Sequence, residues 1–466
     1  MEEQNPPIAE NRMGYQPIFP LLMRISLPMV FSMLIQAMYN VVDSLFVARL
    51  GEDALSAVSL AFPVQNLMIA VSVGTGIGVN ALLSKRLGEQ NWKQVTRTAE
   101  NGIILAGFSY LLFLLFGLFG AGWFFRIQTD SAALQAYGFD YLSVVTVFSF
   151  GLFGQVCFER LLQSTGKTVL VMISQGLGAL INIILDPILI FGLGPFPRLE
   201  VRGAAIATVA GQIIGCIFAV AVNRLFNHEL RLRLRKIRVH FQTIREIYGV
   251  GLPSIIMQSI ASVMTLGMNN ILLAFNTASA ALGDTAVAAF GVYFKLQSFV
   301  FMPVFGFNNG LVPIIAYNYG AGRPKRMAEA IRWSVLFDCG YMLLGTLVLL
   351  LFPAEILSWF NASENLLAIG VPALRIIGSS YVIAAFCIVC SSVFQALGNG
   401  LYSMIVSIAR QLVVLLPVAF LLARTGRLAL VWWAFPIAEV ACLLVTLVFF
   451  RRIWRQKISL ISEESA

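Results

Sequence analysis

The chain has 466 residues, of which 58% are hydrophobic and only 12% are charged, and its formal net charge is +9. An ordinary soluble domain carries about 25% charged residues, so this composition excludes one and indicates an integral membrane protein. The apolar runs are long enough for spanning helices of about 20 residues, which excludes a barrel of short strands.

Apolar runs separated by turn and charge signals predict an all-α fold of twelve transmembrane helices. They cover residues 22–46, 56–84, 98–124, 132–158, 167–192, 203–224, 248–275, 286–314, 331–352, 367–394, 402–424 and 429–451. Residues 1–20 are polar and no basic flank leads into a short apolar core. The first helix is therefore expected to stay as an anchor rather than to be part of a cleaved signal.

Two of these helices carry an aspartate among apolar residues. In the first helix Gln36, Asn40 and Asp43 have the spacing of one helical face. In the fifth helix Asn182 and Asp186 are four residues apart and again share a face. A carboxylate in the hydrocarbon layer costs on the order of 3 kcal/mol, so it is rarely found there without a partner or a task. The two acids together predict a functional site.

Carboxylate, amide and hydroxyl oxygens suit either Na⁺ or a carried proton, and Thr208 of the sixth helix would add a hydroxyl. The alternative is that Asn and Asp only join helices by hydrogen bonds.

Pro28 and Pro187 are predicted hinges, because proline removes a backbone hydrogen bond; an ordinary packing bend is the alternative. Four polar residues of the first half are predicted to face a substrate cavity: Gln36, Asn40, Gln65 and Gln163.

Basic residues in the connections predict the orientation. The link after the sixth helix holds seven of them, namely Arg224, Arg231, Arg233, Arg235, Lys236, Arg238 and Arg245. More basic residues follow the eighth and twelfth helices, so the positive-inside rule places both termini in the cytoplasm. A minority of basic residues lies in loops on the opposite side and does not fit this orientation: Arg198, Arg202, Arg424 and Arg427. An RNA-binding arm at 224–246 is the alternative, but a basic domain linker explains the same charges and no nucleic-acid partner is expected.

The second half of the chain repeats the first at an offset of 232 residues. Leu50-Gly51 returns as Leu282-Gly283, and the other matched pairs are Ala57 and Ala289, Gln65 and Gln297, Gly74 and Gly306, Gly78 and Gly310, Gly88 and Gly320, Lys93 and Lys325, Gln163 and Gln395, and Gly166 and Gly398. Six spans return a chain to its starting side, so the duplication predicts two six-helix lobes related by an axis along the membrane normal.

The predicted organisation is a pair of lobes with a linker and two tails. It comprises a cytoplasmic tail at 1–21, a first lobe at 22–224, a basic linker at 225–247, a second lobe at 248–452 and a cytoplasmic tail at 453–466. Two lobes around a central cleft are typical of alternating-access transport, while a duplicated receptor or membrane enzyme is a rarer arrangement.

The acids are not repeated. The positions that match Asp43 and Asp186 are Met268 and about Leu416, so the ion site is expected in the first lobe. The charged residues in or near second-half spans are Lys295, Asp338, Arg375, Arg410 and Glu439, and the sequence does not assign them a role.

All six cysteines lie in apolar segments and are expected to be packing residues. Cys387 and Cys390 are three residues apart, but no histidine or second cysteine pair accompanies them as in a zinc site. The two histidines lie in the basic link, and no phosphate-binding loop or nucleophile–base constellation is found. The chain is therefore not expected to be an enzyme, and no cofactor is expected.

Several segments match a known pattern. They are Leu27-Pro28, Tyr39-Asn40-Val-Val-Asp43, Leu50-Gly51, a Gly-rich second helix with Gly88, Phe290-Gly-Val-Tyr-Phe-Lys-Leu-Gln297, Met302-Pro303 and Pro313 through Asn318-Tyr-Gly-Ala-Gly322. Over residues 22 to 455 they resemble the MATE (multidrug and toxic-compound extrusion) transporters, particularly the MepA-like and DinF-like bacterial branches.

The resemblance implies a monomeric antiporter of the bacterial inner membrane, surrounded by lipid, that exports amphiphilic and often cationic drugs and dyes in exchange for H⁺ or Na⁺. It implies that the cation site is formed by Asp43, Asn182, Asp186 and Thr208, with any Na⁺ at the first three, and that Pro28 bends the first helix. The NorM-like branch has an acid in the seventh helix and this sequence has none there, which favours coupling in the first lobe.

Two other functions stay open. A flippase for lipid-linked glycans would need a strongly cationic central cavity and often extra spans, and twelve spans with an acid pair argue against it. The other possible function is that of a receptor or a membrane enzyme.

Overall fold

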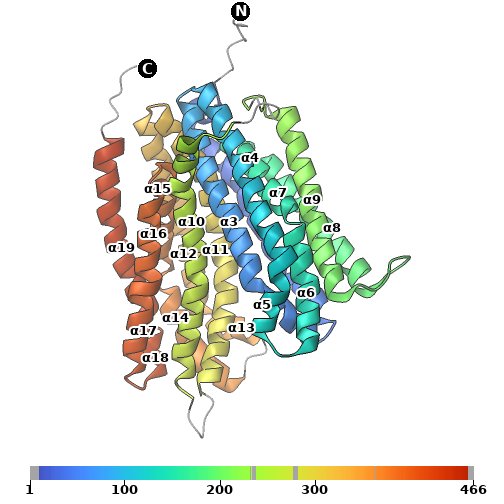
Figure 1. Ribbon diagram of the computed structural model, residues 1–466. Coiled ribbons are helices and arrows are strands. Elements are labelled where there is room, and N and C mark those ends of the chain that lie inside the picture. The colour runs from blue at the N-terminus through green and yellow to red at the C-terminus, as the bar shows by residue number, and fades with distance from the viewer. Residues whose placement is uncertain (1–9, 231, 233–237, 277–281, 361–362, 460–466) are drawn as a thin grey trace, which may run out of the picture.

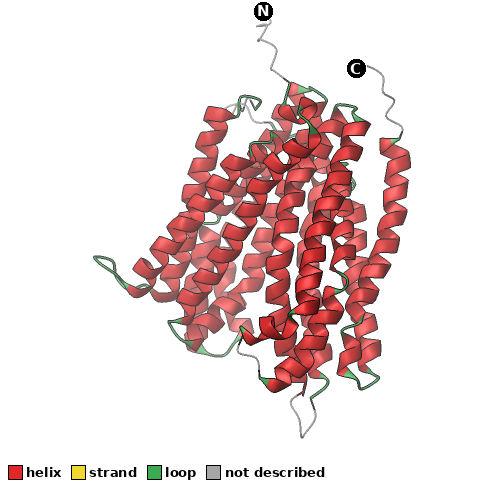
Figure 2. Ribbon diagram, turned by 180° about the vertical axis from the view of Figure 1, so that it is seen from behind, coloured by secondary structure: helices red, strands yellow, loops and turns green. Residues whose placement is uncertain are grey.

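The structure is a computed structural model that describes residues 10–230, 232, 238–276, 282–360 and 363–459. The described residues form helices joined by short connections, with no strand among them (Figure 2). Four basic residues of the link lie outside the described residues, namely Arg231, Arg233, Arg235 and Lys236, and so do the outer parts of both predicted tails. The all-α fold class is confirmed.

The first lobe contains eight α-helices and a π-helical segment, preceded by the short helix α1 (Arg12–Tyr15). Its helices are α2 (Ile18–Ala48), α3 (Glu52–Gly88), α4 (Trp92–Leu115), the π-helical η1 (Phe116–Gly120), α5 (Ala121–Gln128), α6 (Ala132–Val147), α7 (Phe150–Ser164), α8 (Thr168–Phe191) and α9 (Glu200–Phe226). α4, η1 and α5 together form one long span, Trp92–Gln128.

The second lobe is also built of helices. It contains α10 (Phe241–Leu273), α11 (Leu282–Gly320), α12 (Pro324–Leu351), α13 (Pro353–Ser358), α14 (Glu364–Gly378), α15 (Tyr381–Ala396), α16 (Gly400–Ile408), the π-helical η3 (Ala409–Leu415), α17 (Leu416–Ala423), α18 (Leu428–Val431), α19 (Ala434–Ile453) and η4 (Trp454–Ile458). The long helices run side by side between two ends of the molecule (Figure 1).

Ten described helices are long and apolar enough to cross a membrane, and two bent pairs bring the number to twelve. The sequence predicted one continuous helix at 132–158 and another at 367–394, and this is wrong: α6 and α7 meet at 43° and α14 and α15 at 47°. The breaks, at Phe148–Ser149 and Ser379–Ser380, lie at nearly equivalent places in the repeat. A Gly/Ser pair, here Gly378 and Ser379, is a known cause of a kink in the second case.

Glycines hold the two lobes close together. In α3, Gly74 and Gly78 face the backbone of α10, where a Cβ on Gly74 would lie 2.8 Å from the Ile255 nitrogen. Their equivalents in α11, Gly306 and Gly310, face the backbone of α2 in the same way. The repeat found in the sequence is therefore also a repeat in packing, since each lobe places its second long helix against the first long helix of the other.

The outer surface of the bundle is apolar. Phe119, Trp123, Leu344 and Val448 are each at least 63% exposed. A soluble protein would not present so many large apolar side chains, whereas a lipid-facing surface requires them.

Candidate functional site

Asp43 and Asp186 come together between α2 and α8. The two helices pack along each other, and the two carboxyl groups are within hydrogen-bonding contact. Asp186 is fully buried, and the Oδ1 atom of Asp43 is inaccessible to solvent and has no hydrogen-bond partner among the described residues. Two carboxyl groups can hydrogen-bond only when they share a proton, and two carboxylates so close repel each other unless a cation joins them.

Asn182 and Thr208 extend this pair by hydrogen bonds. With the amide orientation that satisfies the hydrogen-bond network, Asn182 donates to Asp186 Oδ2 at 3.0 Å and accepts from the Thr208 N–H at 3.1 Å. Both residues are at most 2% exposed. The four residues expected at the cation site therefore lie together in one buried cluster formed by α2, α8 and α9.

The sequence analysis did not assign Tyr39 to this cluster. Its hydroxyl contacts Thr208, and its ring lies near both acids. The signal was present, because Tyr39 precedes Asp43 by four residues and therefore shares its helical face. Two carboxyl groups, one amide and one hydroxyl group on α2, α8 and α9, together with the phenol, provide enough oxygen atoms for a hard cation.

Both predicted hinge prolines lie inside continuous helices. Pro28 is within α2 and Pro187 is within α8, directly after Asp186. Each removes one backbone N–H from its helix, so one turn of α8 is weakened beside the acid pair.

A separate cavity of about 450 Å³ lies between the two lobes. Its walls come from α2, α3, α7 and α8 on one side and α10, α11, α15, α16, η3 and α19 on the other. Among the residues predicted to face a cavity, Gln36 lines it. Asn40 and Gln65 are not part of its lining, and Gln163 instead donates to the Asn309 carbonyl across the lobes. None of the four cation-site residues lines it.

The charges that line the cavity are Glu159, Arg160 and Arg410. Glu159 is 4% exposed and accepts hydrogen bonds from Gln155 (2.9 Å), Ser174 (2.8 Å) and Gln175 (2.9 Å). The sequence analysis missed Glu159 and Arg160 because it ended the fourth helix at residue 158, whereas α7 continues to Ser164.

The polar residues of the second-half spans divide into buried partners and surface groups. Asp338 is buried and accepts a hydrogen bond from Asn308 at 2.6 Å, while Arg410 pairs with Glu439 at 3.1 Å. Lys295 and Arg375 are exposed. At the places that match the acid pair of the first lobe, Met268 is fully buried and Leu416 half-buried. The second lobe therefore has acids of its own inside its helices, with Asp338 buried and Glu439 half-buried, but at other positions.

The lobes are joined tightly at one end of the bundle. We call this end the terminal face; it comprises α1, η4 and the connections at 88–92, 164–168, 320–324 and 396–400. Gly88 and Gly320 lie here, and a Cβ on either one would overlap a carbonyl oxygen of the other lobe, that of Tyr317 or Lys85. The backbones of α3 and α11 are thus in direct contact.

The short helix α1 bridges the lobes at the same face. On one side Asn11 donates to the Thr165 carbonyl of the first lobe at 3.1 Å. On the other side Asn318 and Arg326 of the second lobe donate to the Met13 carbonyl at 3.0 and 3.2 Å. The Asn318-Tyr-Gly-Ala-Gly322 segment noted in the sequence is therefore part of this closed end.

Comparison with known proteins agrees with this architecture. The MatE family model matches residues 28–188 and 253–421, one match in each lobe. A FAD transporter from Shewanella oneidensis is 27% identical over 87% of this chain and 88% of its own. The multidrug export protein MepA from Staphylococcus haemolyticus is 26% identical over 91% of each chain.

A solved structure extends the similarity to three dimensions. The outward-facing conformation of a multidrug resistance MATE family transporter has a TM-score of 0.89, with 23% identity over 99% of this chain and 100% of the other. The fold is therefore that of the MATE transporters. Since the family model covers more than half of the sequence, this chain belongs to the MatE family, whose members named here are transporters rather than enzymes.

Proposed function

We propose that this protein is a multidrug efflux antiporter that exports amphiphilic compounds in exchange for H⁺ or Na⁺. The observation that carries the proposal is the enclosed contact of Asp43 with Asp186, apart from a large cavity shared by both lobes. Ion and cargo then have separate sites. Separate sites permit coupling if ion binding favours one conformation of the lobes and cargo binding favours another conformation.

The terminal face is the cytoplasmic end in this proposal. The described basic residues at this end include Arg224, Arg238, Arg323, Arg451 and Arg452, as the positive-inside rule requires. The joined backbones at Gly88 and Gly320 then close the cytoplasmic side. The lobes would separate there to admit cargo.

The test is dye export in inverted vesicles under an imposed pH gradient or an imposed Na⁺ gradient. We expect one gradient to drive dye movement and the other to have no effect, which identifies the coupling ion. Dye movement that neither gradient changes would contradict ion-coupled antiport.

A second candidate cargo is an anionic amphiphile such as a flavin nucleotide. Two arginines and one glutamate line the cavity, and Glu159 is already satisfied by three neutral donors. The similarity to a FAD transporter points to the same class. The acidic pair outside the cavity could couple either cargo.

For this candidate we expect inverted vesicles to accumulate FAD, and Arg160→Gln to reduce the accumulation several-fold because a guanidinium facing the phosphates is lost. The control is Arg332→Gln, which changes an exposed arginine of α12. Absence of FAD accumulation with the unsubstituted protein would leave cationic and neutral compounds as the cargo.

A further inference from the structure

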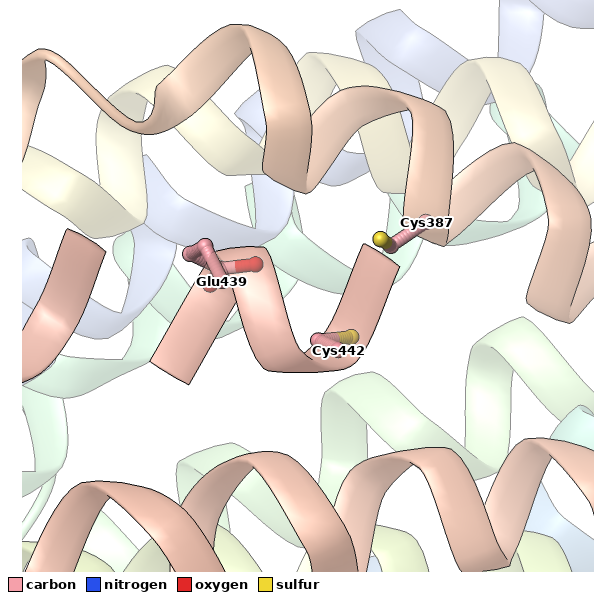
Figure 3. A group of neighbouring side chains, drawn as sticks. All are labelled: Cys387, Glu439 and Cys442. Carbon is pink, nitrogen blue, oxygen red and sulfur yellow. The ribbon is translucent and has the colours of Figure 1, made fainter. Parts of the chain in front are cut away.

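Cys387, Glu439 and Cys442 bring three potential metal ligands to one point in the second lobe. The two sulfur atoms and a carboxylate oxygen all lie within 4.8 Å of one another. Cys387 extends from α15 towards the turn of α19 that carries the other two, as Figure 3 shows. Glu439 and Cys442 are three residues apart and therefore share one face of α19.

We propose that these three side chains form a binding site for a thiophilic divalent cation, with Zn²⁺ as the type ion. Zn²⁺ binds thiolate sulfur at about 2.3 Å and carboxylate oxygen at about 2.0–2.2 Å in a tetrahedron, so its ligand atoms are roughly 3.5–4 Å apart. The observed separations exceed this by only about 1 Å at most. Small rotations of three side chains are enough to close the site.

The charges around the cluster balance when the ion is bound. Two thiolates, one carboxylate and Zn²⁺ carry a net charge of about −1. Arg410 lies beside them, with its Nη1 atom 3.1 Å from Glu439 Oε1, and its positive charge makes the group neutral. Neutrality matters here because an unbalanced charge inside a membrane protein is costly.

One oxygen of the Glu439 carboxylate is also available to bind a metal ion. Glu439 Oε2 is inaccessible to solvent and accepts no hydrogen bond from the described residues. Buried polar atoms nearly always have a partner, so an oxygen left over beside two thiols is a candidate ligand atom. Thr446 lies 3.9 Å from the Cys442 sulfur and would orient it from outside.

The cluster can be reached from the cavity between the lobes. Cys387, Cys442 and Arg410 all contribute to the cavity wall. Three protein ligands and one position open to water are the arrangement of an exchangeable zinc site rather than a closed structural one. Arg410 itself belongs to the π-helical segment η3, and such segments are frequent at functional sites.

The sequence analysis considered a different pair of cysteines as a possible zinc site. Cys387 and Cys390 are close in the chain, but Cys390 is fully buried in the apolar core and is not part of the cluster. The partner of Cys387 lies 55 residues away on another helix. Cys390 therefore provides a matched control, being a buried cysteine of the same helix.

The test is Co²⁺ titration of the reduced, detergent-purified full chain, with Co²⁺ as a coloured substitute for Zn²⁺. We expect a thiolate-to-cobalt absorption band that Zn²⁺ abolishes. Cys387→Ser and Cys442→Ser should each remove most of it, and Glu439→Gln should weaken Co²⁺ affinity about tenfold. Cys390→Ser should leave the band intact, and size-exclusion profiles verify that each variant is folded.

Three results would overturn the proposal. One is absence of the band in the unsubstituted protein. Another is a band that persists in both Cys387→Ser and Cys442→Ser. A third is thiol counting on the protein as isolated that finds these two cysteines joined as a disulfide. Because the readout is metal binding, it does not depend on whether the protein exports drugs.

Discussion

Asp186→Asn and Asp43→Asn are each expected to reduce ion-driven dye export by about tenfold or more, the size of a typical coupling factor between two sites. Asparagine has nearly the same shape as aspartate but cannot bind or release the coupling proton or supply a negative charge to Na⁺. Ion binding then no longer distinguishes between the two arrangements of the lobes, and equal affinity shifts no equilibrium. The measurement is the initial rate of dye export under the effective gradient.

The matched control is Asp53→Asn, which changes an exposed aspartate of the same lobe. We expect this variant to export dye at the unsubstituted rate. Equal amounts of folded protein in the membrane must be verified for all three variants. Unchanged export in both Asp43→Asn and Asp186→Asn would refute an ion site at this pair.

Gly88→Ala and Gly320→Ala are expected to be the most damaging small substitutions at the terminal face. A single methyl group on either glycine would overlap a backbone carbonyl of the opposite lobe, and backbone cannot move aside as a flexible side chain can. Overpacking of this kind costs about 1–3 kcal/mol, which shifts the closed arrangement against the open one by about 5- to 150-fold. Export should fall because the lobes no longer close at this end.

Gly107→Ala and Gly340→Ala serve as controls, because a Cβ at either position meets no atom within 4 Å. A second measurement separates poor closure from poor folding. An impermeant maleimide added to inverted vesicles should label Cys387 and Cys442, which line the cavity, faster in Gly88→Ala than in the unsubstituted protein. Normal export and normal labelling would mean that this contact does not form during transport.

Part of the site was predictable from sequence because it depends on local rules. The acids Asp43 and Asp186 were identified because burying a charge in the membrane is costly. Their amide neighbours were identified because helical spacing places them on the same face as the acids. The contact between the two acids is consistent with that prediction, although their role in coupling stays a proposal. Glu159 was missed for an equally local reason, since the helix boundary was placed one residue before it.

The sequence by itself determined the membrane class, the number of spans and the duplication, because hydrophobic length and repeated residues are properties of the chain alone. Only the tertiary structure decided the bends at residues 148 and 380, the joined backbones at Gly88 and Gly320, and the partners of Arg410 and Cys387. The physical reason is that a helix in lipid is apolar on all its faces. Hydrophobic periodicity then says little about how each helix is rotated, so contacts between distant helices appear only once the helices are packed.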